Sequence, residues 1–257
     1  RAQTWVQGQM KAMGLVNVAA EPFMDFGVTW DNEYVSVHLL APDYQPMVGY
    51  PVAHTGSTQG RQQAPAVIVD LLVKADLEKY RGTLKGKAVL VTPPAVVDLT
   101  SLTNGVPRLT PQDLDARERT VIEPARVTPP RVARHPDLLT AEEKIAFYAA
   151  EGVTAVLQCE SGWLGAVRGF SRPGSRADGW SRAGMLASPA IVAITPEHYN
   201  RMYRILARGI PVQIEVEVRN RVGDTVQQAM NLVGEIPGSD LKDEVVMIGA
   251  HLDTWHA

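Results

Sequence analysis

Apolar side chains alternate with polar ones at two widely separated places in this sequence. The first lies between Tyr34 and Leu40, and the second, from Val212 to Val218, has Val or Ile at every second position. Successive side chains of a β-strand point to opposite faces, so a period of two predicts a strand with one face in a core and the other in solvent. The chain is therefore expected to build part of its core on a β-sheet.

Helix signals lie between the expected strands. An amphipathic helix in the first residues should end at Gly14, and a capping box over Thr140–Glu143 begins a second helix that should end at Gly152. The hydroxyl of Thr195, followed by Pro196, should cap a third helix. Short apolar strands are expected at 66–70, 87–92, 153–159 and 190–194. This mixture of helices and short strands predicts an α/β fold.

Three segments are expected to be irregular. Eight prolines and six arginines in Pro93–Pro136 rule out a long regular element, and interleaved acidic residues favour a solvated mixed-charge excursion over an anion-binding surface. The Gly-, Ser- and Arg-rich segment Glu160–Met185 is a loop long enough to be functional or disordered. Gly223 and Asp224 predict a turn, after which a returning strand should run through Leu232.

Composition excludes several classes of protein. The formal net charge of -3, from 25 Lys and Arg against 28 Asp and Glu, leaves no basic excess, so nucleic acid is not expected as the main partner. The longest apolar stretches fall far short of the roughly 20 residues that span a bilayer, so no membrane span is expected. The single cysteine, Cys159, rules out a disulfide scaffold and is expected to be a small buried side chain.

The main candidate for chemistry is His251, with Asp253 two residues later. Both follow the apolar stretch Val245–Ile248, which predicts a strand, and in open α/β sheets sites lie beyond the carboxyl ends of strands. An imidazole can bind a metal through one ring nitrogen while a nearby carboxylate fixes its tautomer and raises its basicity. The alternative is that His and Asp end a strand by chance.

Two blocks of sequence resemble a known family. Asn231–Gly238 (NLVGEIPG) and Val245–Trp255 (VVMIGAHLDTW) occur in the order and at the separation found at the opening of the catalytic domain in two-zinc exopeptidases of the aminopeptidase and plasma glutamate carboxypeptidase type. The stretches around Leu84–Gly86, Ala149–Val153 and Ser188–Ala190 resemble the protease-associated domain that these enzymes carry as an insertion. The resemblance covers nearly the whole chain, and the Pro-rich stretch matches it least.

The resemblance implies an architecture. The α/β fold would be the start of an interrupted zinc-exopeptidase domain with an inserted β-rich protease-associated (α+β) domain. Residues 1–50 would belong to the peptidase domain and 51–226 to the insertion, while 227–257 would form the first strands of the catalytic core up to the first zinc motif. Both ends of the chain look cut, so we expect a truncated portion of a longer protein, secreted or periplasmic by resemblance, whose signal segment lies outside this chain.

The resemblance also implies an activity. Such enzymes are hydrolases that cleave terminal peptide bonds with a water activated by two zinc ions. His251 matches a zinc ligand of the family, and Asp253 matches the catalytic-site carboxylate that orients this ligand. The family's other ligands and general base follow this motif, and one imidazole cannot hold zinc where about three protein ligands are usual. We therefore expect a zinc metallo-exopeptidase parent acting on peptides, and a chain that alone holds no zinc stably and is inactive.

Two alternatives stay open. The chain could be a non-catalytic protease-associated module that binds partners or shapes substrate access. The parent could also have carboxypeptidase or dipeptidase specificity, because four loop arginines would bind a terminal carboxylate if they reached His251. These are Arg168, Arg172, Arg176 and Arg182. Solvated arginines on a surface loop are the simpler interpretation, so the resemblance favours an aminopeptidase-like enzyme, and the oligomeric state is left open.

Overall fold

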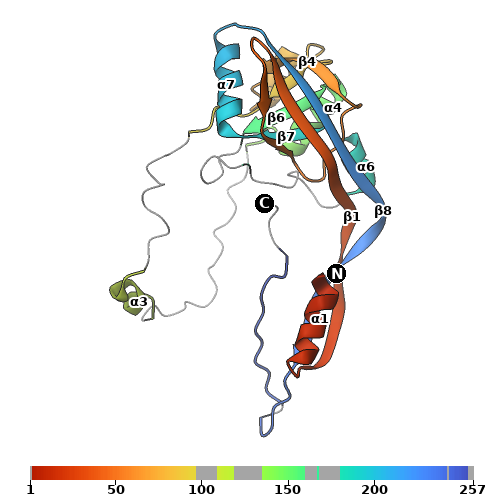
Figure 1. Cartoon of the computed structure of the whole chain (residues 1–257), viewed down its shortest axis with the longest axis vertical. Helices are drawn as coiled ribbons and strands as arrows, with labels where there is room; N and C mark the ends of the chain where they lie inside the picture. The colour runs from red at the N-terminus through yellow and green to blue at the C-terminus, as the bar shows by residue number, and fades with distance from the viewer. Residues whose placement is uncertain are drawn as a thin grey trace.

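The fold is organised around one eight-stranded mixed sheet with the strand order β2-β1-β8-β4-β5-β6-β7-β3 (Figure 1). The computed structural model describes residues 2–96, 109–118, 135–159, 167, 180–241 and 243–253. The strands are β1 (Val16–Ala41), β2 (Gln45–Met47), β3 (Gly49–Pro51), β4 (Gln62–Ile68), β5 (Ala88–Leu90), β6 (Ala155–Cys159), β7 (Ile191–Ile194) and β8 (Val212–Glu235). The helices are α1 (Ala2–Ala12), the 3₁₀ turn η1 (Lys74–Asp76), α2 (Leu77–Tyr80), α3 (Pro111–Glu118), α4 (Ala141–Glu151), α6 (Arg182–Ala187) and α7 (Pro196–Ala207). The predicted α/β class is confirmed.

The centre of the sheet consists of the parallel strands β4 to β7. Along β6, Leu157 belongs to an apolar cluster that includes Tyr199 of α7, whereas Val156 belongs to a second cluster that includes Tyr148 of α4. Parallel strands covered on both faces have continuous apolar sequences, which explains the uninterrupted stretches predicted here. Cys159 is buried in the first of these clusters, as predicted.

The two ends of α4 follow directly from the sequence. Glu143 N donates to Thr140 Oγ1 at 3.0 Å, and Thr140 N donates to the Glu143 carboxylate at 2.7 Å, which completes the capping box. At the other end Gly152 adopts a left-handed backbone conformation with φ +69°. The predicted helix is confirmed, and it buries Ile145 and Tyr148 against the sheet.

The sheet curls until its two edges meet. β2 and β3 lie at opposite ends of the strand order, although a single residue, Val48, separates them in the chain. The Val48 N–H donates to His198 Nδ1 on α7 at 2.9 Å, and the Val48 carbonyl accepts from Thr195 N at 3.0 Å. Helix α7 therefore holds the seam of a nearly closed sheet, which we call the barrel.

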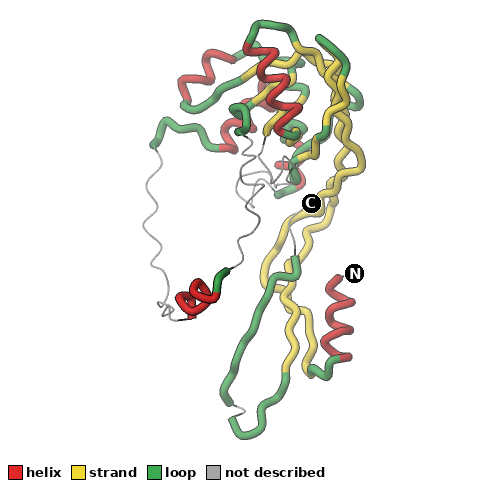
Figure 2. The backbone as a smooth tube through the Cα atoms, turned by 60° about the vertical axis from the view of Figure 1, so that its left-hand side comes forward, coloured by secondary structure: helices red, strands yellow, loops and turns green. Residues whose placement is uncertain are grey.

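Strands β1 and β8 are the longest, and they leave the barrel together as a two-stranded ribbon (Figures 1 and 2). Their barrel ends contribute Val37 and Val216 to the same core as the central strands. Their far ends lie beside α1, whose residues are all partly or fully exposed. In the ribbon, residues 16–28 of β1 pair with residues 226–235 of β8. The division of the chain into 1–50, 51–226 and 227–257 stays a prediction.

The turn predicted at Gly223 and Asp224 is wrong, because β8 continues through both residues without reversing. The three residues between Val222 and Val226 lie opposite one residue of β1, Thr29, as in a β-bulge. A Cβ on Gly223 would come within 2.3 Å of Thr29 Oγ1. The glycine therefore permits a close approach of two strands at the bulge rather than a chain reversal.

The strand predicted at Val245–Ile248 is also wrong. The four side chains are 87%, 93%, 87% and 96% exposed, and the backbone forms an irregular segment after β8. In the part of the chain that the structure describes, no strand lies in register with it, and an extended segment without a partner leaves its N–H and C=O groups to water.

Two further predictions need correction. The hydroxyl of Thr195 lies 3.1 Å from His198 Nδ1 and makes no cap bond to the backbone of α7, although this helix begins at Pro196 as expected. The loop predicted over Glu160–Met185 ends earlier, because α6 begins at Arg182. The rest of this segment, except for residues 167, 180 and 181, and most of Pro93–Pro136 lie outside the described residues. Among the residues that the structure does describe, no helix has the length and apolar character to cross a membrane.

The buried hydroxyl of Tyr199 should make the fold less stable at alkaline pH. Its fully buried hydroxyl donates to the Thr92 carbonyl at 2.7 Å and accepts from Thr92 N at 3.0 Å, and burial raises the pKa of Tyr199 to about 12. Tyrosine in the unfolded chain has a pKa of about 10, so the neutral phenol stabilises the fold fully below pH about 10, and this contribution is lost as the pH approaches about 12. We expect a loss of about 2 kcal/mol over this range.

Urea unfolding of Tyr199→Phe across this pH range checks the expectation. The variant should lose about 1–3 kcal/mol at neutral pH, because the Thr92 groups lose their partner. Its further loss above pH 10 should be smaller than that of the parent chain. An equal alkaline loss in both proteins would assign the effect to other groups, such as Tyr148, whose pKa is also raised by burial.

Candidate active site

The two residues singled out for chemistry lie side by side. His251 Nδ1 is 2.8 Å from Asp253 Oδ1, in the irregular segment after β8. An ionised carboxylate can only accept hydrogen bonds, so Nδ1 is the ring nitrogen that carries the proton. The lone pair is then on Nε2, which is the tautomer in which an imidazole oriented by a carboxylate binds a metal ion.

The contact also affects Asp253. The hydrogen bond with His251, together with a smaller contribution from the backbone N–H of Asp253, holds the pKa of this carboxyl group below its usual value. The two side chains are 91% and 84% exposed, so water screens their attraction. The pair therefore has the donor and acceptor arrangement of a metal-binding imidazole and the carboxylate that orients it. These two roles stay predictions.

The described residues do not complete a zinc site. Among them, no three His, Cys, Asp or Glu side chains lie close enough together to hold a metal ion. A catalytic zinc ion usually has three protein ligands and one open position. His251 would supply one of these ligands, and no reaction step can be assigned to the residues that the structure describes.

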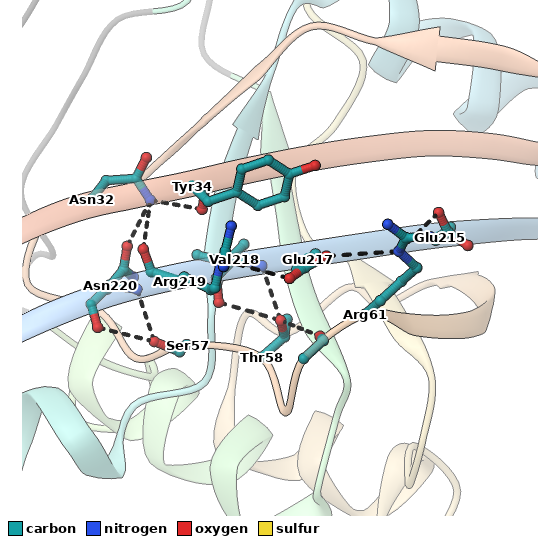
Figure 3. Close-up of polar contacts among 11 residues, drawn as sticks. Asn32, Tyr34, Ser57, Thr58, Arg61, Glu215, Glu217, Val218, Arg219 and Asn220 are labelled. Atoms are coloured by element: carbon teal, nitrogen blue, oxygen red, sulfur yellow. Dashed lines mark hydrogen bonds and ion pairs between the residues drawn. The ribbon is translucent and has the colours of Figure 1, made fainter.

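The outer edge of β8 is bound by three successive partners. Strand β4 pairs with residues 212–216, after which the loop that follows β3 takes over (Figure 3). Thr58 Oγ1 accepts from Val218 N, and Ser57 Oγ accepts from Asn220 N, each at 2.9 Å. These two hydroxyl groups replace the backbone carbonyls that a neighbouring strand would offer.

Arg182 is the third partner. Its Nη1 donates to the carbonyls of Val222 and Gly223 at 2.8 and 3.1 Å, and lies 2.8 Å from Asp224 Oδ1. In this arrangement the guanidinium group binds the bulge of β8 rather than a carboxylate near His251. The other three arginines considered for carboxylate binding, Arg168, Arg172 and Arg176, lie outside the described residues.

A cluster of rings beside the bulge was not predicted. Trp180 stacks on His54 with ring centroids 4.4 Å apart and packs against Phe26 at 5.1 Å, and Trp30 lies 6.3 Å from His54. His54 is buried and has a left-handed backbone conformation with φ +63°, which is unusual for a residue other than glycine. The members come from three separate parts of the sequence, 26–30, His54 and Trp180, so no local spacing indicates that these parts meet.

Comparison with solved structures places this fold. A peptidase M28 precursor from Shewanella amazonensis SB2B has a TM-score of 0.63 and 20% sequence identity, over 99% of this chain and 49% of that protein. The fold is similar to that of one half of an M28 peptidase. An aminopeptidase from Aneurinibacillus sp. strain AM-1 has a TM-score of 0.49 and 16% identity, over 93% of this chain and 42% of that one. A zinc aminopeptidase from Bacillus subtilis has a TM-score of 0.48 and 14% identity, over 93% and 41%.

Other comparisons add no family assignment, because no protein-family model and no curated protein matches the chain. The likeness therefore concerns the fold. The chain spans about half, 49%, of the length of the M28 precursor. The activity, substrate and zinc content of a complete protein are therefore proposals.

Proposed function

We propose that this chain is the N-terminal portion of a zinc-dependent, aminopeptidase-like exopeptidase. The observation that carries the proposal is the contact between His251 and Asp253 at 2.8 Å, which orients the imidazole as a metal ligand. The fold likeness to half of an M28 peptidase precursor supports it. In this proposal residues 1–50 and 227–257 belong to the peptidase domain, and 51–226 form the inserted protease-associated domain.

Exposed apolar side chains occur on both sides of this division, and the longest run of them lies in the part assigned to the peptidase domain. Trp5 and Met13 near α1, Phe23 on the ribbon and the segment Val245–Ile248 are all more than half exposed. They lie in the parts assigned to the peptidase domain, and exposed apolar surface of this extent is typical of regions that other protein surfaces cover. In the proposed complete protein, the remainder of the peptidase domain covers them.

The proposed reaction is hydrolysis of a terminal peptide bond. In the complete protein, two zinc ions would lower the pKa of a bound water and stabilise the oxyanion that forms. This chain would supply the imidazole of His251, oriented by Asp253, and the remaining ligands and the general base would come from outside it. The chain without the remainder is therefore proposed to hold no zinc stably and to be inactive.

The test compares two similar His-Asp pairs in the complete protein. His251→Ala should lower kcat/KM by about 100-fold or more and reduce the zinc content, because it removes a ligand. Asp253→Asn should cost about 10–100-fold in activity or metal affinity, as orienting carboxylates do. His135 and Asp137 have the same spacing and also form an exposed pair, so His135→Ala is the matched control and should change neither quantity.

Full activity and full zinc content in His251→Ala would contradict the proposal.

A second assay identifies the terminus that is cleaved. It uses one dipeptide with its amino end blocked and the same dipeptide with its carboxyl end amidated. We expect the amino block to stop cleavage and the amide to permit it. Cleavage that survives the amino block would replace the aminopeptidase assignment by carboxypeptidase or dipeptidase specificity.

A second candidate is a non-catalytic protease-associated module. The observation that favours it is that the described members of both apolar clusters of the barrel all lie outside residues 236–253, so the barrel has its own core. A complete protein that hydrolyses no peptide but binds partners through the barrel would support this candidate. Peptide binding and a secreted or periplasmic location belong to the first proposal and rest on the sequence resemblance.

A further inference from the structure

We propose that Trp180 and Arg182 form a brace that fixes the direction in which the ribbon leaves the barrel. The brace is a conformational device of the fold, and it does not depend on the proposed peptidase activity. Three observations carry it: the irregular pairing of the ribbon at this point, the acceptors that Arg182 binds, and the rings between which Trp180 lies.

The pairing of β1 with β8 is irregular at six places along its length, and two of them lie where the ribbon leaves the barrel. The register between β1 and β8 shifts between Asp25 and Gly27 and again between Val28 and Trp30. Gly27 has φ +123°, a conformation that other residues rarely adopt. Bulges bend strands and increase their twist, and each one interrupts the ladder of hydrogen bonds. Without further contacts, the ribbon would be held at this point by a weakened part of its own pairing.

Arg182 supplies the hydrogen bonds that the bulge lacks. Its guanidinium group donates to the Val222 and Gly223 carbonyls, and such charge-assisted bonds are stronger than those between neutral groups. The ion pair with Asp224 adds little, because the two side chains are 46% and 84% exposed. The carbonyl contacts are therefore the main contribution of Arg182, and both are made by its Nη1.

Trp180 holds the other strand. Its ring lies between Phe26 on β1 and His54 in the loop after β3, so one side chain contacts both the ribbon and the barrel. Gly27 permits this approach, because a Cβ there would come within 3.0 Å of the Trp180 carbonyl oxygen. Trp180 thus contacts β1 beside the register shift between Asp25 and Gly27, and Arg182 contacts β8 beside the shift opposite Val28 and Trp30.

The brace is anchored in the barrel. Met185 of α6 is fully buried, and Ser188 after this helix lies so close to the loop after β3 that a Cβ on Gly56 would be 2.1 Å from the Ser188 carbonyl oxygen. Helix α6, which carries Arg182, is therefore packed against the barrel. Beyond the bonds of Ser57 and Thr58 to β8, these two side chains then set the direction of the ribbon and of whatever follows it in the chain.

The test measures this direction in the 257-residue chain. Cysteines introduced at the exposed positions Ala146 on α4 and Asn231 on β8 would carry spin labels, while Cys159 is buried and stays unlabelled. The parent chain should give one narrow distance distribution by pulsed electron paramagnetic resonance. Arg182→Ala should broaden it and raise amide hydrogen exchange of residues 222–230 by about tenfold or more, because two charge-assisted bonds are lost and one alone accounts for about tenfold.

Two further variants make the result decisive. Arg221→Ala is the matched control, because Arg221 also lies on β8 but, among the described residues, binds the carboxylates of Asp31 and Glu33 on the neighbouring strand rather than the bulge. It should change neither measurement. Arg182→Lys keeps the charge but places it on a side chain of different length and geometry, and should give an intermediate broadening. An unchanged distribution in Arg182→Ala, or equal broadening in Arg221→Ala, would overturn the proposal.

Discussion

Replacing Gly56 with alanine is expected to lower the free energy of unfolding by about 3 kcal/mol or more. A Cβ at this position would lie 2.1 Å from the carbonyl oxygen of Ser188, which is far inside van der Waals contact. The obstacle is backbone, so no side chain can rotate away. Gly56 is also held from its other side, because its own carbonyl accepts from Asn220 Nδ2 at 2.8 Å. To relieve the overlap, the end of α6 must move away from the loop after β3, or this loop must move and lose its hydrogen bond to Asn220 of β8.

Gly60 in the same loop is the control for this substitution. It has φ +70° but no heavy atom within 4 Å of an added Cβ, so Gly60→Ala carries only the strain of a left-handed alanine, about 1–2 kcal/mol. Urea unfolding of both variants separates steric overlap from backbone strain. Equal losses in the two variants would show that contact with Ser188 is not the cause.

Local structure was predictable from the sequence wherever a few adjacent residues decide it. The capping box at Thr140 and the glycine at Gly152 fix both ends of α4 through contacts within one or two turns. The alternation from Val212 to Val218 likewise identified the buried face, since Val212, Ile214, Val216 and Val218 are all buried. In each case the physical cause lies inside the segment that shows the pattern.

Pairing partners were not predictable in the same way. Gly223 and Asp224 have the composition of a turn, but the conformation is decided by Thr29 and Arg182, which lie elsewhere in the sequence. The apolar stretch Val245–Ile248 has the composition of a buried strand, whereas a strand also requires a neighbour with which to bond. Composition describes what a segment can do, and its partners decide which of these conformations it adopts.

The candidate site was predictable only in part. The spacing of His251 and Asp253 allows the observed contact, because two residues bring the carboxylate within reach of the imidazole. The position of Arg182 on the bulge was not predictable. The charge of the four loop arginines suggested carboxylate binding and does not indicate which backbone carbonyls Arg182 reaches. The roles of His251 and Asp253 in catalysis stay predictions.

Substitutions along two strands should distinguish the two kinds of burial in this sheet. On β6, Leu157 and Val156 are adjacent but belong to opposite clusters, so Leu157→Ala should cost about 3 kcal/mol and Val156→Ala about 2 kcal/mol. On β8, Ile214 is fully buried and Gln213 is exposed. Ile214→Ala should cost about 3 kcal/mol, and Gln213→Ala should remain within about 0.5 kcal/mol of the parent chain.

Denaturant unfolding of the four variants measures these differences. The pattern follows from the position of each strand: β6 is covered by α4 on one face and by α7 and the curled part of the sheet on the other, whereas β8 presents its polar face to solvent. Adjacent substitutions should therefore have similar effects on β6 and alternating effects on β8. If Val156→Ala were as mild as Gln213→Ala, α4 would not cover the sheet, and the two-sided burial of the parallel strands would be wrong.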